Sequence, residues 1–133
     1  RSSELRGTTV GGADIPLVID EIPSLAAAAF FAKGETVVRG AEELRVKESD
    51  RVKGIVAMVR AFGGEIEELP DGFVVRGGKK ALPADASSGG DHRLAMAASV
   101  LALNAGGRSL IRDAGCADIS FPGFFDELQR LRR

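Results

Sequence analysis

Two segments of the sequence carry apolar side chains on nearly every side that a helix would present, and they restrict the fold more than any other feature. The first follows helical spacing at Ile22, Leu25, Ala26, Ala29 and Phe30. The second, residues 94–103, is interrupted only by Ser99. A helix on a protein surface keeps a polar face, so we expect both helices in the interior, covered by sheets. Both runs are far shorter than the roughly 20 residues of a membrane span, which excludes a transmembrane segment.

The same two segments belong to a repeat of about seventy residues. Asp20, the helical run, Gly34 and the strand-like residues 36–39 recur as Asp91, a second helical run, Gly107 and residues 109–112. The sequence therefore predicts an α/β (α+β) fold of repeated supersecondary units with buried helices and outer sheets. We expect residues 1–77 to form one folding unit and residues 78–133 a second.

The remaining elements are predicted from local signals. Residues 52–62 show helical periodicity, with Ser49 as the expected N-cap and Gly63-Gly64 as the stop. Residues 65–69 and 73–76 flank a Pro-Asp-Gly turn and predict a hairpin. We expect a strand at 35–39, another at 109–112, and a last helix over 123–131.

Composition excludes several classes of protein. Eighteen Lys and Arg against nineteen Asp and Glu give a net charge of −1, and Trp and Tyr are absent, which argues against a nucleic-acid-binding surface. The single cysteine cannot form an internal disulfide and fits a reducing, cytoplasmic compartment. Because the first methionine is Met58, we expect the chain to be part of a longer protein.

The densest candidate site is the charged run 44–51, Leu-Arg-Val-Lys-Glu-Ser-Asp-Arg. One interpretation is a solvated helix start. The other is recognition of phosphate or carboxylate, because basic residues oppose the helix dipole there unless an anion binds. Lys47 and Arg51 lie four positions apart, so we expect them to share a helix face and point toward the free amides of the first turn.

A second candidate is Gly89-Gly90-Asp91-His92-Arg93, directly before the apolar run. Asp91 can be an N-cap and His92 a structural residue with satisfied hydrogen bonds, and for His92 we favour that interpretation. Arg93 begins a buried helix and needs a partner, so we favour ligand binding for it. Asp91 and His92 would then support the site.

The repeat relates Asp20 to Asp91, and the charged run begins a third helix. If the three helix starts converge, they form a site for a multiply anionic ligand, with Asp20 and Glu48 as acid–base candidates. Asp20 alone would be an ordinary N-cap. Cys116 is expected to be a small buried residue and not a nucleophile, and one His with one Cys is too few for a metal site.

Four motifs, in order and at fitting distances, resemble the EPSP synthase (3-phosphoshikimate 1-carboxyvinyltransferase) family. They are Asp20-Glu21-Ile22-Pro23, the run 44–51, Asp91-His92-Arg93-Leu94-Ala95-Met96-Ala97, and residues 120–125, Ser-Phe-Pro-Gly-Phe-Phe. The resemblance covers essentially all 133 residues, but these resemble only the last third of the family's chain, within the C-terminal lobe.

The resemblance implies an enzyme that transfers the enolpyruvyl group of phosphoenolpyruvate to the 5-hydroxyl of shikimate 3-phosphate in the route to chorismate and the aromatic amino acids. It implies repeated βαβαββ units in an inside-out barrel and no metal or organic cofactor. Asp20 resembles the acid–base aspartate and a shikimate 3-phosphate contact, Lys47 a second contact to that substrate, and Glu48 the partner carboxylate. Arg51 and Arg93 resemble the arginines that hold phosphoenolpyruvate.

One departure is Ile119, which stands where some family members carry a phosphoenolpyruvate-binding lysine, so we assign it no ligand role. The resemblance also implies a monomeric parent whose missing N-terminal part completes the site, and an inactive isolated fragment. Two alternatives remain. The chain could be a non-catalytic module that binds an anion or completes a partner, or it could belong to the related UDP-N-acetylglucosamine enolpyruvyl transferases.

Overall fold

The computed structural model describes residues 4–131. Its strands are β1 (Thr9–Val10), β2 (Glu35–Val38), β3 (Glu65–Leu69), β4 (Gly72–Arg76), β5 (Asp85–Ser87) and β6 (Leu110–Arg112). Its α-helices are α1 (Ile15–Val18), α2 (Ile22–Phe31), α3 (Arg51–Ala61), α4 (His92–Asn104) and α5 (Phe124–Leu131). Four 3₁₀ helices join them, η1 (Gly12–Asp14), η2 (Ile19–Glu21), η3 (Glu42–Val46) and η4 (Ala114–Ile119).

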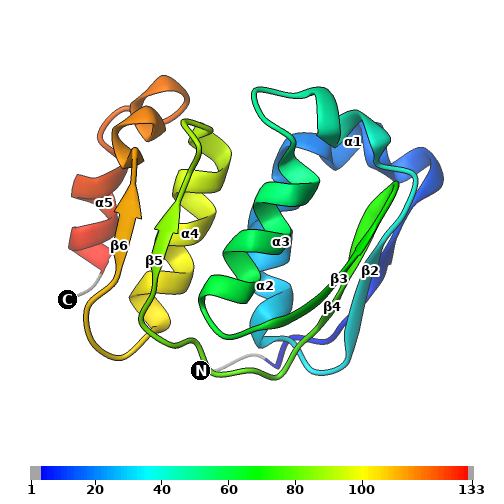
Figure 1. Cartoon of the computed structure of the whole chain (residues 1–133), viewed down its shortest axis with the longest axis horizontal. Helices are drawn as coiled ribbons and strands as arrows, with labels where there is room; N and C mark the ends of the chain where they lie inside the picture. Colours follow the sequence, from blue (N-terminus) through cyan, green and yellow to red (C-terminus); the bar gives the residue numbers. More distant parts are fainter. Residues whose placement is uncertain (1–3, 132–133) are drawn as a thin grey trace.

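Two sheets lie on either side of a layer of helices. The larger sheet has the strand order β1-β2-β4-β3, in which β1 is parallel to β2 and the other neighbours are antiparallel. The smaller sheet pairs β5 with β6 in parallel. Helices α2, α3 and α4 lie between these sheets and contact one another, whereas α5 lies beside β6 at one end of the molecule (Figure 1). The expectation of inner helices and outer sheets is therefore confirmed.

The two apolar segments form the centre of this helical layer. Ile22, Ala26 and Phe30 of α2 are fully buried, as are Ala95 and Leu101 of α4. Helix α4 is not buried on every side. Its exposed side chains lie near its C-terminal end and are those of Val100, Leu103 and Asn104. None of the described helices combines the length and apolar character needed to cross a bilayer.

Both copies of the repeat form a strand, a buried helix and a second strand parallel to the first. Residues 9–76 have the order β1-α1-α2-β2-α3-β3-β4, which is βαβαββ with the short helix α1 added before α2, and residues 85–131 have the order β5-α4-β6-α5. The larger sheet lies before residue 77 and the smaller sheet after it. Because α4 packs on α2 and α3, the two parts share one core. That each part folds as a unit of its own stays a prediction.

Helix α3 ends as expected but does not begin as expected. Gly63, with φ of +88°, and Gly64 donate their N–H groups to the carbonyls of Arg60 and Val59, the Schellman arrangement that closes a helix. At the other end Asp50 is the N-cap, since its carboxylate accepts the N–H of Lys53. The prediction of Ser49 as the cap is wrong, because its hydroxyl is bonded elsewhere.

The hairpin is confirmed, and one glycine explains its position against the neighbouring strand. A Cβ on Gly72, the first residue of β4, would lie 1.8 Å from the carbonyl oxygen of Val38 in β2. Only glycine permits that approach.

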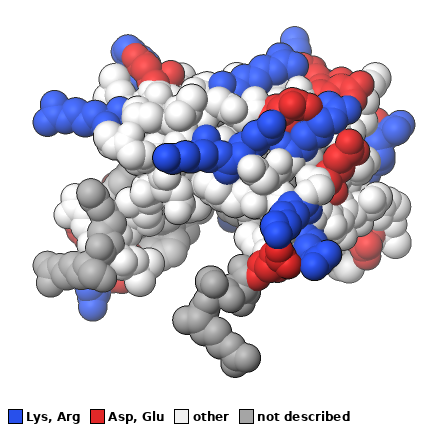
Figure 2. All heavy atoms as spheres, turned by 90° about the horizontal axis from the view of Figure 1, so that it is seen from below, with Lys and Arg blue, Asp and Glu red and all other residues white. Residues whose placement is uncertain are grey.

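Figure 2 shows Lys and Arg beside Asp and Glu on the face seen from below, in keeping with the near-zero net charge.

Candidate active site

The starts of α2, α3 and α4 converge on the guanidinium of Arg51, which is 1% exposed. Arg51 Nη1 donates to Asp20 Oδ1 at 3.1 Å, and Nη2 donates to Glu48 Oε2 at 2.6 Å. Arg51 Nε donates to Asp91 Oδ2 at 2.9 Å. Asp20 belongs to η2 just before α2, and Asp91 is the N-cap of α4. The predicted convergence of the three helix starts is confirmed.

Asp91 is the innermost acid of this cluster, with 0% exposure. Besides the two bonds from Arg51, it accepts the hydroxyl of Ser49 at 2.7 Å and the N–H of Arg93 at 3.0 Å. Burial disfavours its charged form, but the hydrogen bonds from Arg51 and Ser49 outweigh burial and hold the pKa of Asp91 below its ordinary value. Asp91 is therefore a buried anion that anchors Arg51.

The charge of Arg51 is fixed in the same way. Burial acts to lower the pKa of Arg51, and the hydrogen bond and Coulombic attraction from Asp91, with further attraction from Glu48, overcome that effect and raise it. The guanidinium is thus charged at any physiological pH. Its interactions join the three helix starts, which come from distant parts of the sequence, and fix their geometry.

The two predicted acid–base residues face solvent from this anchored cluster. The side chains of Asp20 and Glu48 are 47% and 54% exposed, although each gives one oxygen to Arg51. Asp20 is not an N-cap, because no side-chain cap bond is formed at the start of α2. A carboxylate held by a buried arginine and open on its other side has a defined position and access to a ligand.

Lys47 is the residue whose predicted position is wrong. It follows η3 in extended backbone, with φ of −79° and ψ of −155°, and helix α3 begins only at Arg51. The four-residue spacing therefore does not place Lys47 and Arg51 on one helix face. Lys47 is partly buried, and none of the carboxylates in residues 4–131 lies within ion-pair distance of it.

Arg93 has a buried side-chain nitrogen without a hydrogen-bond partner among the described residues. Its Nη1 lies 3.9 Å from Glu21 Oε2, and the side chain is 29% exposed. The buried nitrogen is Nε. An unsatisfied buried donor is costly, and a bound anion would satisfy it. That Arg93 binds a ligand stays a prediction.

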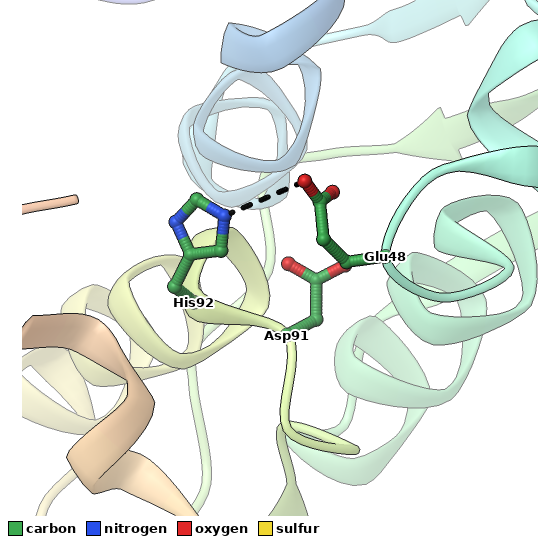
Figure 3. A group of neighbouring side chains, drawn as sticks. All are labelled: Glu48, Asp91 and His92. Atoms are coloured by element: carbon green, nitrogen blue, oxygen red, sulfur yellow. Dashed lines mark ion pairs between the residues drawn. The ribbon is translucent and has the colours of Figure 1, made fainter. Parts of the chain in front are cut away.

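His92 connects the cluster to the segment before α5. Its Nδ1 lies 2.7 Å from Ser120 Oγ, and its Nε2 lies 3.9 Å from Glu48 Oε1 (Figure 3). This geometry supports the interpretation of His92 as a structural residue. Glu48, Asp91 and His92 bring ligand-type atoms within 4.8 Å of one another. Arg51 and Ser49 already occupy both oxygens of Asp91, so these residues do not fit a metal as they stand.

Sequence reasoning missed three polar residues of this region, namely Ser49, Ser120 and Glu21. Each lay inside a quoted motif, but only their contacts with Asp91, His92 and Arg93 give them a role.

Cys116 is partly buried, not fully buried as expected, with its Sγ 3.7 Å from Ser88 Oγ. Ile119 is 72% exposed.

Comparison with known proteins places the chain in a family. The sequence model of EPSP synthase (3-phosphoshikimate 1-carboxyvinyltransferase) matches residues 1–128. The chain belongs to the EPSP synthase family. A 3-phosphoshikimate 1-carboxyvinyltransferase from Desulforudis audaxviator (strain MP104C) is 52% identical over 132 residues, 99% of this chain and 31% of that protein. Another, from Pelotomaculum thermopropionicum (strain DSM 13744 / JCM 10971 / SI), is 50% identical over 98% of this chain and 30% of that protein.

The solved structures agree with the family assignment. An EPSP synthase from Acinetobacter baumannii, solved at 2.37 Å, superposes with a TM-score of 0.90 and 34% identity. The match covers 96% of this chain and 30% of that one. The chain thus spans about a third of the length of the EPSP synthases it matches, and it has their fold over that span.

Proposed function

We propose that this chain forms the C-terminal portion of an EPSP synthase, a transferase of the shikimate pathway to chorismate. In this proposal the enolpyruvyl group of phosphoenolpyruvate is transferred to the 5-hydroxyl of shikimate 3-phosphate, and phosphate is released. The observation that carries it is the cluster in which buried Arg51 holds two solvent-facing carboxylates, Asp20 and Glu48, at fixed positions.

The reaction needs groups of this kind. The attacking hydroxyl must lose a proton, and the methylene carbon of phosphoenolpyruvate must gain one and later lose it. We assign the first task to Asp20, with a contact to shikimate 3-phosphate, and the second to Glu48. Both carboxylates are within reach of solvent and lie on the same guanidinium, so one ligand could contact both.

Both substrates are polyanions, and the cations of the site would receive them. Lys47, partly buried and without an ion pair to a described carboxylate, would contact shikimate 3-phosphate. Arg93, with its unsatisfied Nε, would bind phosphoenolpyruvate. For Arg51 to bind the same substrate, the anion would displace Asp20 or Glu48 from one of its nitrogens, which their exposure to solvent permits.

The proposal includes a further polypeptide part, because the chain spans about 30% of its relatives and its cluster is open to solvent. We propose that this part closes the site, that the parent enzyme is a cytoplasmic monomer, and that the isolated chain is inactive. The rival function is a non-catalytic module that binds an anion or completes a partner chain. It uses the same cations but has no need of Asp20 and Glu48.

A chimera tests the proposal. This chain replaces the matching 31% of the Desulforudis audaxviator relative, to which it is 52% identical. Phosphate release is measured with both substrates, and we expect a turnover within about tenfold of that of the relative. In the chimera, Asp20→Asn and Glu48→Gln are each expected to lower kcat by about 10² to 10⁴ while substrate affinities change little.

Matched variants separate the enzyme from the module. Asp85→Asn, at an exposed acid paired with Arg112 and remote from the cluster, should leave kcat unchanged. Arg93→Ala should lower kcat/KM for phosphoenolpyruvate at least about tenfold, the value of one charge-assisted contact. A folded chimera that binds both substrates but releases no phosphate, or whose Asp20 and Glu48 variants retain full kcat, would favour the module.

A further inference from the structure

The segment 46–50 carries Lys47 and Glu48 and joins η3, which ends at Val46, to α3. Residues 47–50 belong to neither a helix nor a strand, and of these four residues Asp50 alone joins the backbone bonding of α3, through its carbonyl, which accepts the N–H of Gly54. One end of the segment is held by Ser49 and Arg51, which both bond to Asp91. The other end requires a separate anchor.

That anchor is Arg45, whose side chain is 24% exposed. Its Nε donates to the carbonyl of Pro70 at 2.9 Å, and its Nη2 donates to the carbonyl of Leu69 at 2.8 Å and to Glu68 Oε2 at 3.0 Å. These three acceptors belong to the end of β3 and the turn before β4. The fourth acceptor is Asp50, whose Oδ2 lies 3.1 Å from Nη1.

Asp50 connects the side chain of Arg45 to the start of helix α3. The same carboxylate that accepts Nη1 of Arg45 accepts the N–H of Lys53 and caps the helix. The next residue is Arg51, the centre of the cluster. The hairpin turn, the segment 46–50 and the first turn of α3 are thus joined through one guanidinium.

We propose that Arg45 is a positioning residue that holds the segment 46–50 against the β3–β4 turn and so fixes Lys47 and Glu48 in the site. Arg45 itself contacts none of the proposed acid–base residues or the cation Arg93. Its planar fork satisfies two carbonyls and two carboxylates at once, which the single ammonium of a lysine does not reproduce. Charge alone is therefore insufficient at this position.

The effect on catalysis rests on the proposed function. A displacement of about 1 Å in a reacting group can lower a rate by about 10². In the active chimera, Arg45→Lys is expected to lower kcat by about tenfold or more and to raise KM for shikimate 3-phosphate, with KM for phosphoenolpyruvate within about threefold. The fall in kcat would mark misplacement of Glu48, and the rise in KM would mark misplacement of Lys47.

A second readout uses this chain alone and does not depend on its activity. Hydrogen exchange should show the amides of Lys53 and Gly54, which donate to the carboxylate and the carbonyl of Asp50, exchanging at least about tenfold faster in Arg45→Lys, with the amides of α2 and α4 unchanged. The matched control is Arg39→Lys. Arg39 donates to Asp71 of the same turn from β2, is 59% exposed, and makes no contact with residues 46–50.

The outcomes are separable. Faster exchange confined to the amides of Lys53 and Gly54, absent in Arg39→Lys, together with the fall in kcat, supports the proposal. Unchanged exchange at these two amides, unchanged kcat, or faster exchange throughout the chain overturns it, the last because Arg45 would then be only a general stabilising residue. An inactive unsubstituted chimera would contradict the proposed function, while exchange in this chain would still decide the role of Arg45 in holding the segment.

Discussion

Arg51 is the largest fully buried side chain among residues 4–131, and it carries a charge into the interior. Such burial is tolerable only because Asp91, Asp20 and Glu48 surround its guanidinium. The free energy needed to bury these charges is therefore offset by the interactions among these four side chains. Removal of Arg51 leaves the buried carboxylate of Asp91 without its cation.

At this scale we expect Arg51→Met to destabilise the chain by about 3–5 kcal/mol, since it leaves Asp91 buried and ionised. Urea denaturation followed by circular dichroism would measure the loss. Arg112→Met provides the control, because Arg112 pairs with Asp85 in an exposed position and its removal should leave the midpoint unchanged. Equal midpoints for the two variants would mean that the cluster contributes no stability.

The depressed pKa of Asp91 also predicts a dependence of stability on pH. Its ordinary value is 3.8, and its folded value lies lower, so the stabilisation is complete well above pH 3.8 and is lost as pH falls through the folded pKa. Asp91→Asn should flatten the decline of unfolding free energy below about pH 5. Asp126→Asn, at an exposed position of α5, should retain the parental slope, and an identical slope in Asp91→Asn would refute the assignment.

At the scale of elements, α3 is defined by its two ends. Asp50 fixes its start beside the cluster, and Gly63 permits its end through a left-handed backbone conformation. Arg51 is the first residue of α3, so it lies at the opposite end of the helix from Gly63. Changes at the far end of α3 are therefore expected to alter stability without touching the site.

Gly63→Ala tests this view of α3. A Cβ is unfavourable at φ of +88° and would lie 3.0 Å from Leu82 Cδ1, so we expect a loss of about 1–2 kcal/mol in unfolding free energy. Gly106→Ala is the control, since Gly106 does not have a positive φ and a Cβ there meets nothing within 4 Å. Thermal or urea unfolding of both variants gives the comparison. Equal losses would show that the C-cap is not the cause.

At the scale of the whole molecule, the described residues leave apolar and polar surfaces uncovered. A pocket of about 400 Å³ lies beside the edge strand β1 and is lined by residues that include Val10, Leu17 and Leu25. Leu17 is 82% exposed, and the carboxylates of the cluster face solvent. Catalysis of this kind depends on a closed site that excludes water.

We therefore expect the isolated chain to bind the two substrates weakly and to release no phosphate. Phosphorus NMR of the chain with shikimate 3-phosphate and phosphoenolpyruvate, each at millimolar concentration, would test this. The active chimera under the same conditions serves as the positive control. Steady appearance of inorganic phosphate and enolpyruvyl product from the chain alone would contradict the expectation.

Much of the fold was predictable from local sequence. Helical periodicity and apolar side chains predicted α2, α3 and α4, and the Pro-Asp-Gly turn predicted the β3–β4 hairpin. These signals come from residues a few positions apart, so they can be recognised in the sequence. The repeat gave one long-range prediction, that Asp20 and Asp91 lie at equivalent helix starts. The charge pattern predicted anion binding by Lys47, Arg51 and Arg93 and an acid–base role for Glu48, and the resemblance to the family supplied the substrate expected at each.

The partners of each side chain were decided only by tertiary structure. Ser49 and Asp50 are both good N-caps by residue type, and the packing of α3 against α4 gives Ser49 to Asp91 and leaves Asp50 as the cap. The same packing places Arg51 among acids 31 and 40 positions away along the chain. Arg45 likewise finds Pro70 only because η3 lies beside the hairpin. Local sequence predicted most of the helices and strands, but not β1, α1 or β5, which are short. The hydrogen bonds that build the site depend on distances set when the segments pack, so only the tertiary structure decided them.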